Sequence, residues 1–270
     1  MESLSPPDGI SVRYWRNGTS LGLSGSLNKL FAEARGRRLV LMNDDDALLP
    51  EGVAVMAEGF SWSPDVLCAY STIQRLTPAG EHDPAESSLH NTDANTTPEQ
   101  AGLRRDLLVC ALWRQVPPVG FMLTGDAARR VGYADPARVG YALDTEFGIR
   151  LALAYRGRGA FAFIGKPTAQ YRFPSSDGLT RASKPDMFST LWRIVADLPS
   201  LSPDEADARD GLLRRLAHVS TAEHALARRR RDALRILLSR HYPYDDGALR
   251  PLYALRAISN QSASCPAAAK

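Results

Sequence analysis

Four consecutive polar residues, Asn43 to Asp46, are the part of the sequence best suited to chemistry. Three of them, Asp44, Asp45 and Asp46, are acids. Adjacent carboxylates repel one another, and a hard divalent cation would relieve that repulsion while leaving positions for phosphate oxygens. We therefore treat all three acids as candidate metal ligands. The competing interpretation is a turn in which Asp is a loop and cap residue.

The elements around these acids indicate how they are positioned. The apolar run Leu39 to Met42 comes directly before them and has the length of a strand buried on both faces of a parallel sheet. Open α/β sheets place ligand groups at the carboxyl ends of such strands. Apolar residues repeat with helical spacing over residues 27–34 and 53–60. This alternation predicts an α/β fold with a mostly parallel sheet flanked by helices.

The rest of the chain divides by composition. Residues 10–14 read as a strand, and the polar stretch 77–102 reads as a mobile loop or lid. From Pro185 onward the pattern is almost purely helical, and it ends in a tail. We therefore predict a first domain over 1–182, a C-terminal helical extension over 183–262 and a tail over 263–270.

Composition narrows the functional classes. Apolar runs are too short for a transmembrane helix, and the start lacks the pattern of a secretory signal, so we expect a cytoplasmic protein. Cys68, Cys110 and Cys265 are far apart and lack metal-ligand spacing, which predicts reduced thiols.

Charge is concentrated in the last part of the chain. Residues 200–270 carry a net charge of +4. The basic helices are expected to pack on the first domain; the alternative is weak contact with an anionic membrane, which would place the protein at the inner membrane face. The cluster Arg228 to Arg231 lacks the interleaved aromatic residues of a nucleic-acid platform, so no nucleic-acid partner is expected.

A wider pattern surrounds the acids. Asn28, the Ala34-Arg35-Gly36 segment, the apolar run before Asn43, and Leu48 with Pro50 together resemble the donor half of family-two glycosyltransferases, which have the GT-A fold. In that family an acidic D-x-D motif holds Mg²⁺ or Mn²⁺ against the diphosphate of a nucleotide sugar. The resemblance thus implies a nucleotide-sugar donor and a Mg²⁺ or Mn²⁺ cofactor. The donor-binding candidates are Asn28, Asn43, Asp44 and Arg172.

A second stretch resembles the acceptor half of the same family. It comprises residues 120–122, 126–132 and 144–151. There an Asp just before a helix is the base that deprotonates the acceptor hydroxyl, and Asp144 occupies the matching place. The competing interpretation makes Asp144 only a helix N-cap. By the same resemblance, the acceptor-binding candidates are Gly120, Phe121 and Glu146.

The acidic motif itself departs from the family pattern. The register set by Leu48 and Pro50 aligns the first acid of D-x-D with Asn43, which leaves Asp45 as the favoured direct ligand. An alternative register pairs Asp44 with Asp46. Asn43 can donate or accept hydrogen bonds but carries no charge.

Two further departures lie at the ends of the matching region, which covers residues 10–181. Family members open with a strand, a helix and a second strand that help hold the nucleotide base, and this sequence begins after those elements, so we expect weak donor binding. Where many relatives place a His, this chain has Tyr171-Arg172-Phe173. The fork of Arg172 suits phosphate oxygens, although a structural salt bridge explains it equally well.

The resemblance predicts a metal-dependent, inverting glycosyltransferase. Its acceptor would be a sugar, a lipid-linked molecule or a small molecule. The main alternative is a catalytically impaired homologue that serves as a binding or assembly module, because Asn43 replaces an acid and the opening elements of the family are not in this sequence.

Overall fold

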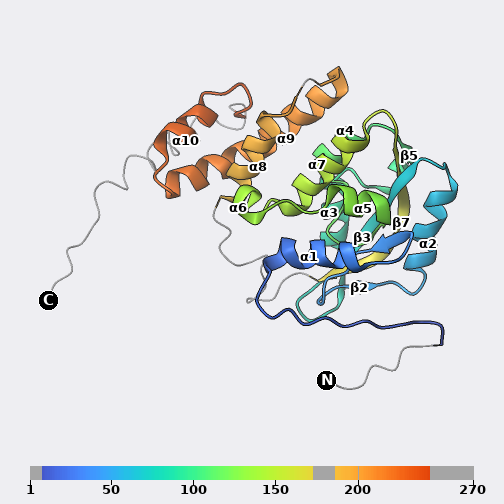
Figure 1. The fold of residues 1–270 in the computed structure, drawn as a ribbon. Coiled ribbons are helices and arrows are strands. Elements are labelled where there is room, and N and C mark those ends of the chain that lie inside the picture. The colour runs from blue at the N-terminus through green and yellow to red at the C-terminus, as the bar shows by residue number, and fades with distance from the viewer. Residues whose placement is uncertain (1–7, 173–185, 200, 244–270) are drawn as a thin grey trace.

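A computed structural model describes residues 8–172, 186–199 and 201–243 of the chain. A single sheet forms its centre, with helices packed around it and the C-terminal helices gathered at one end (Figure 1). The strands are β1 (Arg38–Val40), β2 (Ala47–Leu48), β3 (Val66–Leu76), β4 (His82–Asp83), β5 (Gly102–Arg104), β6 (Phe121–Thr124) and β7 (Ala160–Arg172). The α-helices are α1 (Gly22–Glu33), α2 (Gly52–Glu58), α3 (Pro84–Asp93), α4 (Leu107–Leu112), α5 (Gly125–Val131), α6 (Pro136–Val139), α7 (Leu143–Tyr155), α8 (Met187–Ala196), α9 (Pro203–Leu226) and α10 (Arg230–Leu237), and the 3₁₀ turns are η1 (Gly59–Ser61) and η2 (Pro98–Gln100).

The sheet mixes strand directions. Its main path runs β1-β6-β3-β7-β2, with β4 beside β3 and β5 beside β7. Only the β3–β7 pair is parallel among the pairings of the described residues. Because β6 is antiparallel to both β1 and β3, the strands β1, β3 and β7 all point the same way. Their carboxyl ends therefore meet at one edge of the sheet.

The two faces of the sheet bury different side chains. Tyr70, Phe161 and Phe163 belong to the main apolar cluster, to which α1, α4, α5, α7, α8 and α9 also contribute. Ala69 and Ala162, at the alternate positions of the same strands, pack with Val55 and Phe60 from α2 and η1 on the other face. Because successive side chains of β3 and β7 are buried on opposite faces of the sheet, both strands consist of continuous apolar runs.

The observed sheet corrects the expectation of a mostly parallel one. The fold class is α/β, with helices flanking the sheet, as predicted. The run at residues 39–42, however, is not a central strand, because β1 lies at one end of the strand path and pairs antiparallel with β6. Hydrophobic runs report burial but not strand direction, so the insertion of β6 between β1 and β3 left no signal in the sequence.

Two local expectations were also wrong. Residues 10–14 are extended and exposed but pair with no strand of the described chain. The polar stretch 77–102 contains β4, α3, η2 and the start of β5 instead of a structureless loop. Helix α3 begins at a proline after Asp83, whose side chain accepts a hydrogen bond from the Glu86 amide. Capping thus starts a helix that apolar periodicity does not reveal.

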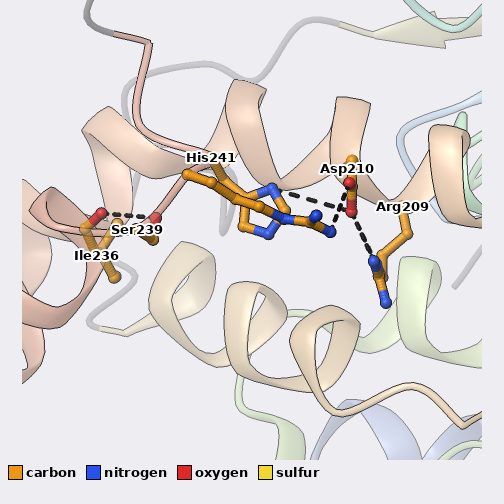
Figure 2. A network of polar contacts seen from close by, with 6 residues as sticks. Arg209, Asp210, Ile236, Ser239 and His241 are labelled. Atoms are coloured by element: carbon orange, nitrogen blue, oxygen red, sulfur yellow. Dashed lines mark hydrogen bonds and ion pairs between the residues drawn. The ribbon is translucent and has the colours of Figure 1, made fainter.

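The helices at the C-terminal end pack on the rest of the protein. Leu191 of α8 and Leu212 and Leu216 of α9 are buried in the same cluster as the sheet. A polar network then joins α9 to the chain after α10 (Figure 2). In this network Asp210 accepts hydrogen bonds from Arg209 and Arg240. Nδ1 of His241 lies 3.9 Å from Oδ1 of Asp210. The predicted boundaries at 182 and 262 stay predictions, and residues 244–270, with Cys265 and the expected tail, lie outside the described residues.

Candidate active site

The three acids lie at the carboxyl edge of the sheet. The turn Asn43 to Asp46 connects β1 to β2, and β2 pairs with the last part of β7. The parallel pair β3–β7 ends at Leu76 and Arg172, and the amide of Arg172 donates a 3.0 Å hydrogen bond to Asp46 Oδ1. The turn therefore sits where β1 and β7 both end.

Asp46 has both carboxylate oxygens engaged. Besides the bond from Arg172, its Oδ2 accepts a 2.8 Å hydrogen bond from Asn43 Nδ2. Partial burial raises the pKa of Asp46, and the charge of Asp45 adds to this, while the bonds from Asn43 and Arg172 oppose it. Asp46 thus closes the turn, whereas Asp44 and Asp45 are exposed.

The side chain of Arg172 is fixed against the same turn. Its Nε donates a 3.1 Å hydrogen bond to the carbonyl of Asp45. On the other side it lies against Gly80, where an added Cβ would be 3.0 Å from Nη1 and where φ is +88°. A side chain at Gly80 would be strained and would crowd the guanidinium of Arg172. The structure therefore brings Asn43, Asp45, Asp46 and Arg172 together.

The acids meet part of what a divalent metal needs. Among the described residues no three His, Cys, Asp or Glu side chains are arranged to hold a metal ion. With Asp46 occupied by Asn43 and Arg172, the available carboxylates are those of Asp44 and Asp45. Mg²⁺ is commonly held by one or two carboxylates together with substrate phosphates and water. The donor set fits such a shared site and does not fit a cage made of protein alone.

Asp144 lies in the first turn of α7 and is exposed. The N-cap of this helix is Ala142, so the interpretation of Asp144 as an N-cap is wrong. A carboxylate in the first turn is stabilised by the positive end of the helix dipole. Burial, reinforced by the charge of Asp144, raises the pKa of Tyr133 well above its ordinary value. Tyr133 therefore presents a neutral hydroxyl in the electrostatic field of Asp144.

Tyr133 is held rigidly, and sequence reasoning missed it. Its ring stacks on Phe147 at 4.6 Å between centroids and on Phe31 at 5.7 Å. The side chain of Asn28 donates to its carbonyl at 2.9 Å and accepts from its amide at 2.6 Å. This pair of bonds ties α1 to the loop after α5. In the sequence, only Gly132 pointed to this loop, because glycine is favoured where a helix ends. In the structure Gly132 follows α5 with a φ of +57°.

Glu146 and Arg150 hold the same loop from α7. Glu146 is 3% exposed, and its Oε1 accepts a 2.6 Å hydrogen bond from Arg150 Nε. The two terminal nitrogens of Arg150 donate to the carbonyls of Val131 and Gly132, each at 2.7 Å. The guanidinium therefore connects α7 to the end of α5, beside Tyr133.

The remaining acceptor candidates lie at the start of β6. Gly120 has a φ of +77°, and an added Cβ would be 3.0 Å from Ala169 Cβ. Phe121 is paired with Tyr70 and is 2% exposed, so its side chain is part of the core. The acceptor-binding roles of Gly120, Phe121 and Glu146, and a cleft shared by Asp144 with the acids, stay predictions.

Comparison with known proteins finds a similarity in the first part of the chain. Residues 1–107 match the family model described as glycosyl transferase family 2. The matched stretch contains α1, the acids and β3, and it ends at the start of α4. Asp144 and Arg172 lie beyond it. No curated protein matches the chain.

Proposed function

We propose that this protein transfers a sugar from a nucleotide-diphosphate sugar to an acceptor hydroxyl, because residues 1–107 match the family model of glycosyl transferase family 2. The observation that supports this best is the position of the acids. They lie within the matched residues and at the carboxyl edge of a mixed α/β sheet, where such sheets bind ligands.

At the donor end, Asp44 and Asp45 are the proposed ligands of a Mg²⁺ or Mn²⁺ ion. Asp46 and Asn43 shape the turn that presents them. When bound, the ion would supply positive charge for the departing diphosphate. The guanidinium of Arg172, which donates a hydrogen bond to the Asp45 carbonyl, would also donate hydrogen bonds to phosphate oxygens of the donor.

At the acceptor end, Asp144 is the proposed base. It takes the proton of the acceptor hydroxyl while that oxygen forms a bond to the anomeric carbon. The bond between this carbon and the diphosphate oxygen breaks in the same step, and the nucleoside diphosphate leaves. A single displacement from the opposite side inverts the anomeric centre. The neutral hydroxyl of Tyr133 would orient the carboxylate without competing for its proton.

A second function, a binding module without turnover, has one observation in its favour. Asn43 takes the place of an acid in the D-x-D motif, and its side-chain amide donates a hydrogen bond to Asp46. Such a protein would bind nucleotide sugar but neither transfer nor hydrolyse it.

Binding and turnover should be measured on the full chain with a panel of nucleotide sugars, with and without Mn²⁺. We expect Mn²⁺-dependent binding and slow hydrolysis or transfer, and loss of the Mn²⁺ dependence in D44N/D45N. The matched control is D126N, which removes one charge from a side chain that is 96% exposed on α5. Binding without turnover in the wild-type protein would favour the binding module, and no binding of any nucleotide sugar would contradict both functions.

A further inference from the structure

The turn between β3 and β4, residues 77–81, lies against the guanidinium of Arg172. It follows the end of β3, the strand that runs parallel to β7. The amide of Thr77 donates to the carbonyl of Glu81 at 2.8 Å, and the amide of Gly80 donates to the carbonyl of Thr77 at 2.9 Å. Two backbone hydrogen bonds therefore close this β3–β4 turn and fix the position of Gly80.

Helix α3 fastens the hairpin to the edge of β3. The side chain of Asn91 donates to the carbonyl of Ile73 at 3.0 Å and accepts from its amide at 3.2 Å, as a neighbouring strand would. Ser87 Oγ accepts from the amide of Arg75 at 2.8 Å. Polar side chains of α3 thus continue the pairing that β4 makes with β3. The hairpin is therefore attached to the sheet at several points and can support another group.

Gly80 contacts the part of Arg172 that would bind phosphate. A Cβ added at Gly80 would lie 3.0 Å from Nη1, 3.7 Å from Nη2 and 3.8 Å from Cζ of Arg172. All three atoms belong to the guanidinium, and Nε of the same group donates to the carbonyl of Asp45 at 3.1 Å. The β3–β4 turn and the acidic turn therefore both contact this planar group.

Two separate constraints require glycine at position 80. Its φ of +88° is unfavourable for a residue with a Cβ. The approach of Arg172 is the second constraint, because 3.0 Å is shorter than the roughly 3.5 to 4.0 Å of ordinary carbon contacts. Gly157, after α7, has a φ of +74°, but no atom of the described residues lies within 4 Å of an added Cβ. The two glycines therefore separate the backbone requirement from the contact with Arg172.

A supported guanidinium would bind a diphosphate at a lower entropic cost. A long side chain populates many rotamers, and immobilising it when a ligand binds reduces the affinity. The fork of an arginine recognises phosphate oxygens through its plane, so the orientation of that plane matters. Contacts that restrict the plane before the ligand arrives remove part of the cost.

We propose that Gly80 is a positioning residue of the donor site. Because it lacks a side chain, the β3–β4 turn can pack on the guanidinium of Arg172 and hold it in the orientation that binds the donor diphosphate. This inference rests on the proposed function, since it takes Arg172 as a ligand of the diphosphate. Gly80 acts only through Arg172, and its effect is on binding of the diphosphate, not on proton removal by Asp144.

Calorimetry of inorganic pyrophosphate binding to the full chain, in the presence of Mn²⁺, tests the contact. We expect G80A to bind about two- to tenfold more weakly than the wild-type protein, the range for immobilising one long side chain. The matched control, G157A, introduces the same kind of backbone strain without a neighbouring atom and should keep the wild-type affinity. Equal affinities of G80A and the wild-type protein, or equal losses in the two variants, would overturn the inference.

The variant R172K tests whether Gly80 acts through the guanidinium. Lysine keeps the positive charge but has no planar group for the turn to orient. The double variant G80A/R172K should therefore bind pyrophosphate within about twofold of R172K, because the two changes remove the same interaction. If G80A costs as much affinity in the R172K background as in the wild-type protein, Gly80 has only a structural role and the inference is wrong.

Nitrogen-15 NMR of the arginine side chains examines the wild-type protein directly, whether or not G80A folds. The Nε–H signal of Arg172, assigned by its absence from R172K, should show the high order of a fixed group. Order as low as that of an exposed arginine such as Arg231 would overturn the inference.

Failure of the proposed function would be a separate result. If the wild-type protein binds no nucleotide sugar but binds pyrophosphate with the expected dependence on Gly80, sugar transfer is contradicted and the positioning of Arg172 is supported. If the wild-type protein does not bind pyrophosphate, the inference is overturned whatever the panel of nucleotide sugars gives.

Discussion

The donor and acceptor ends of the proposed site are held by different kinds of contact. The acids lie on a short turn that is held by single hydrogen bonds from Asn43 and Arg172 to Asp46. Asp144 lies in the first turn of a helix whose inner face stacks Phe147 on Tyr133 and buries Glu146 against Arg150. Donor-end substitutions should therefore change ligand binding with little cost in stability, whereas substitutions behind Asp144 should also destabilise the fold.

The largest effect is expected at the proposed base. D144N removes the proton acceptor but keeps the size of an exposed side chain, so turnover should fall about 10²- to 10⁴-fold while donor affinity and melting temperature change little. Steady-state kinetics with calorimetry of donor binding would measure this. Undiminished turnover in D144N would exclude Asp144 as the base.

The next effect concerns the stability of the acceptor end. R150A leaves the buried carboxylate of Glu146 without its partner and releases the carbonyls of Val131 and Gly132, which should cost about 3 to 5 kcal/mol in the free energy of unfolding. Chemical denaturation would measure it. The double variant E146Q/R150A should recover part of the loss, because no buried charge is left unpaired. The control is R158A, which removes an exposed hydrogen bond to the Ala154 carbonyl and should change the free energy of unfolding little. An equal cost in R158A would contradict the prediction.

A smaller effect is expected where α1 meets the loop at Tyr133. N28A removes both bonds to the backbone of that residue and should cost about 1 to 3 kcal/mol. N17A removes only the bond to Lys29 on the exposed segment and should cost less than about 0.5 kcal/mol. Equal unfolding midpoints for N28A and the wild-type protein would show that the loop does not depend on α1.

The smallest effect concerns Asp46 and pH. Because its pKa is raised in the folded protein, the folded state holds this proton more tightly than the unfolded chain does. Its contribution to stability is greatest below the unfolded pKa and is lost as pH rises through the raised one. The stability of D46N relative to the wild-type protein should therefore increase as pH rises above the ordinary titration range of an aspartate. Melting temperatures across this range would measure the difference, and a gap that widens toward low pH would contradict it.

The sequence determined which chemical groups are available to the site and several of the helices and strands around it. The apolar run before Asn43 and the acids after it predicted a strand followed by a ligand-binding turn, and the structure has β1 followed by that turn at a carboxyl edge. Helical spacing predicted α1 and α2, because a buried stripe requires apolar residues every three or four positions. Resemblance to family-two glycosyltransferases was confirmed over residues 1–107.

Tertiary structure alone decided which groups meet. The insertion of antiparallel β6 between β1 and β3 follows from pairing between segments about 80 residues apart along the chain, and hydrogen bonds between backbones carry no side-chain signature. The donor-binding role of Asn28 stays a prediction, and only the folded chain shows that its amide binds the backbone of Tyr133, 105 positions away. Likewise the side chain of Asp46 differs from those of Asp44 and Asp45 because it accepts hydrogen bonds from Arg172 of β7 and from Asn43. Three identical side chains in a row acquire different roles because distant strands contact only one of them.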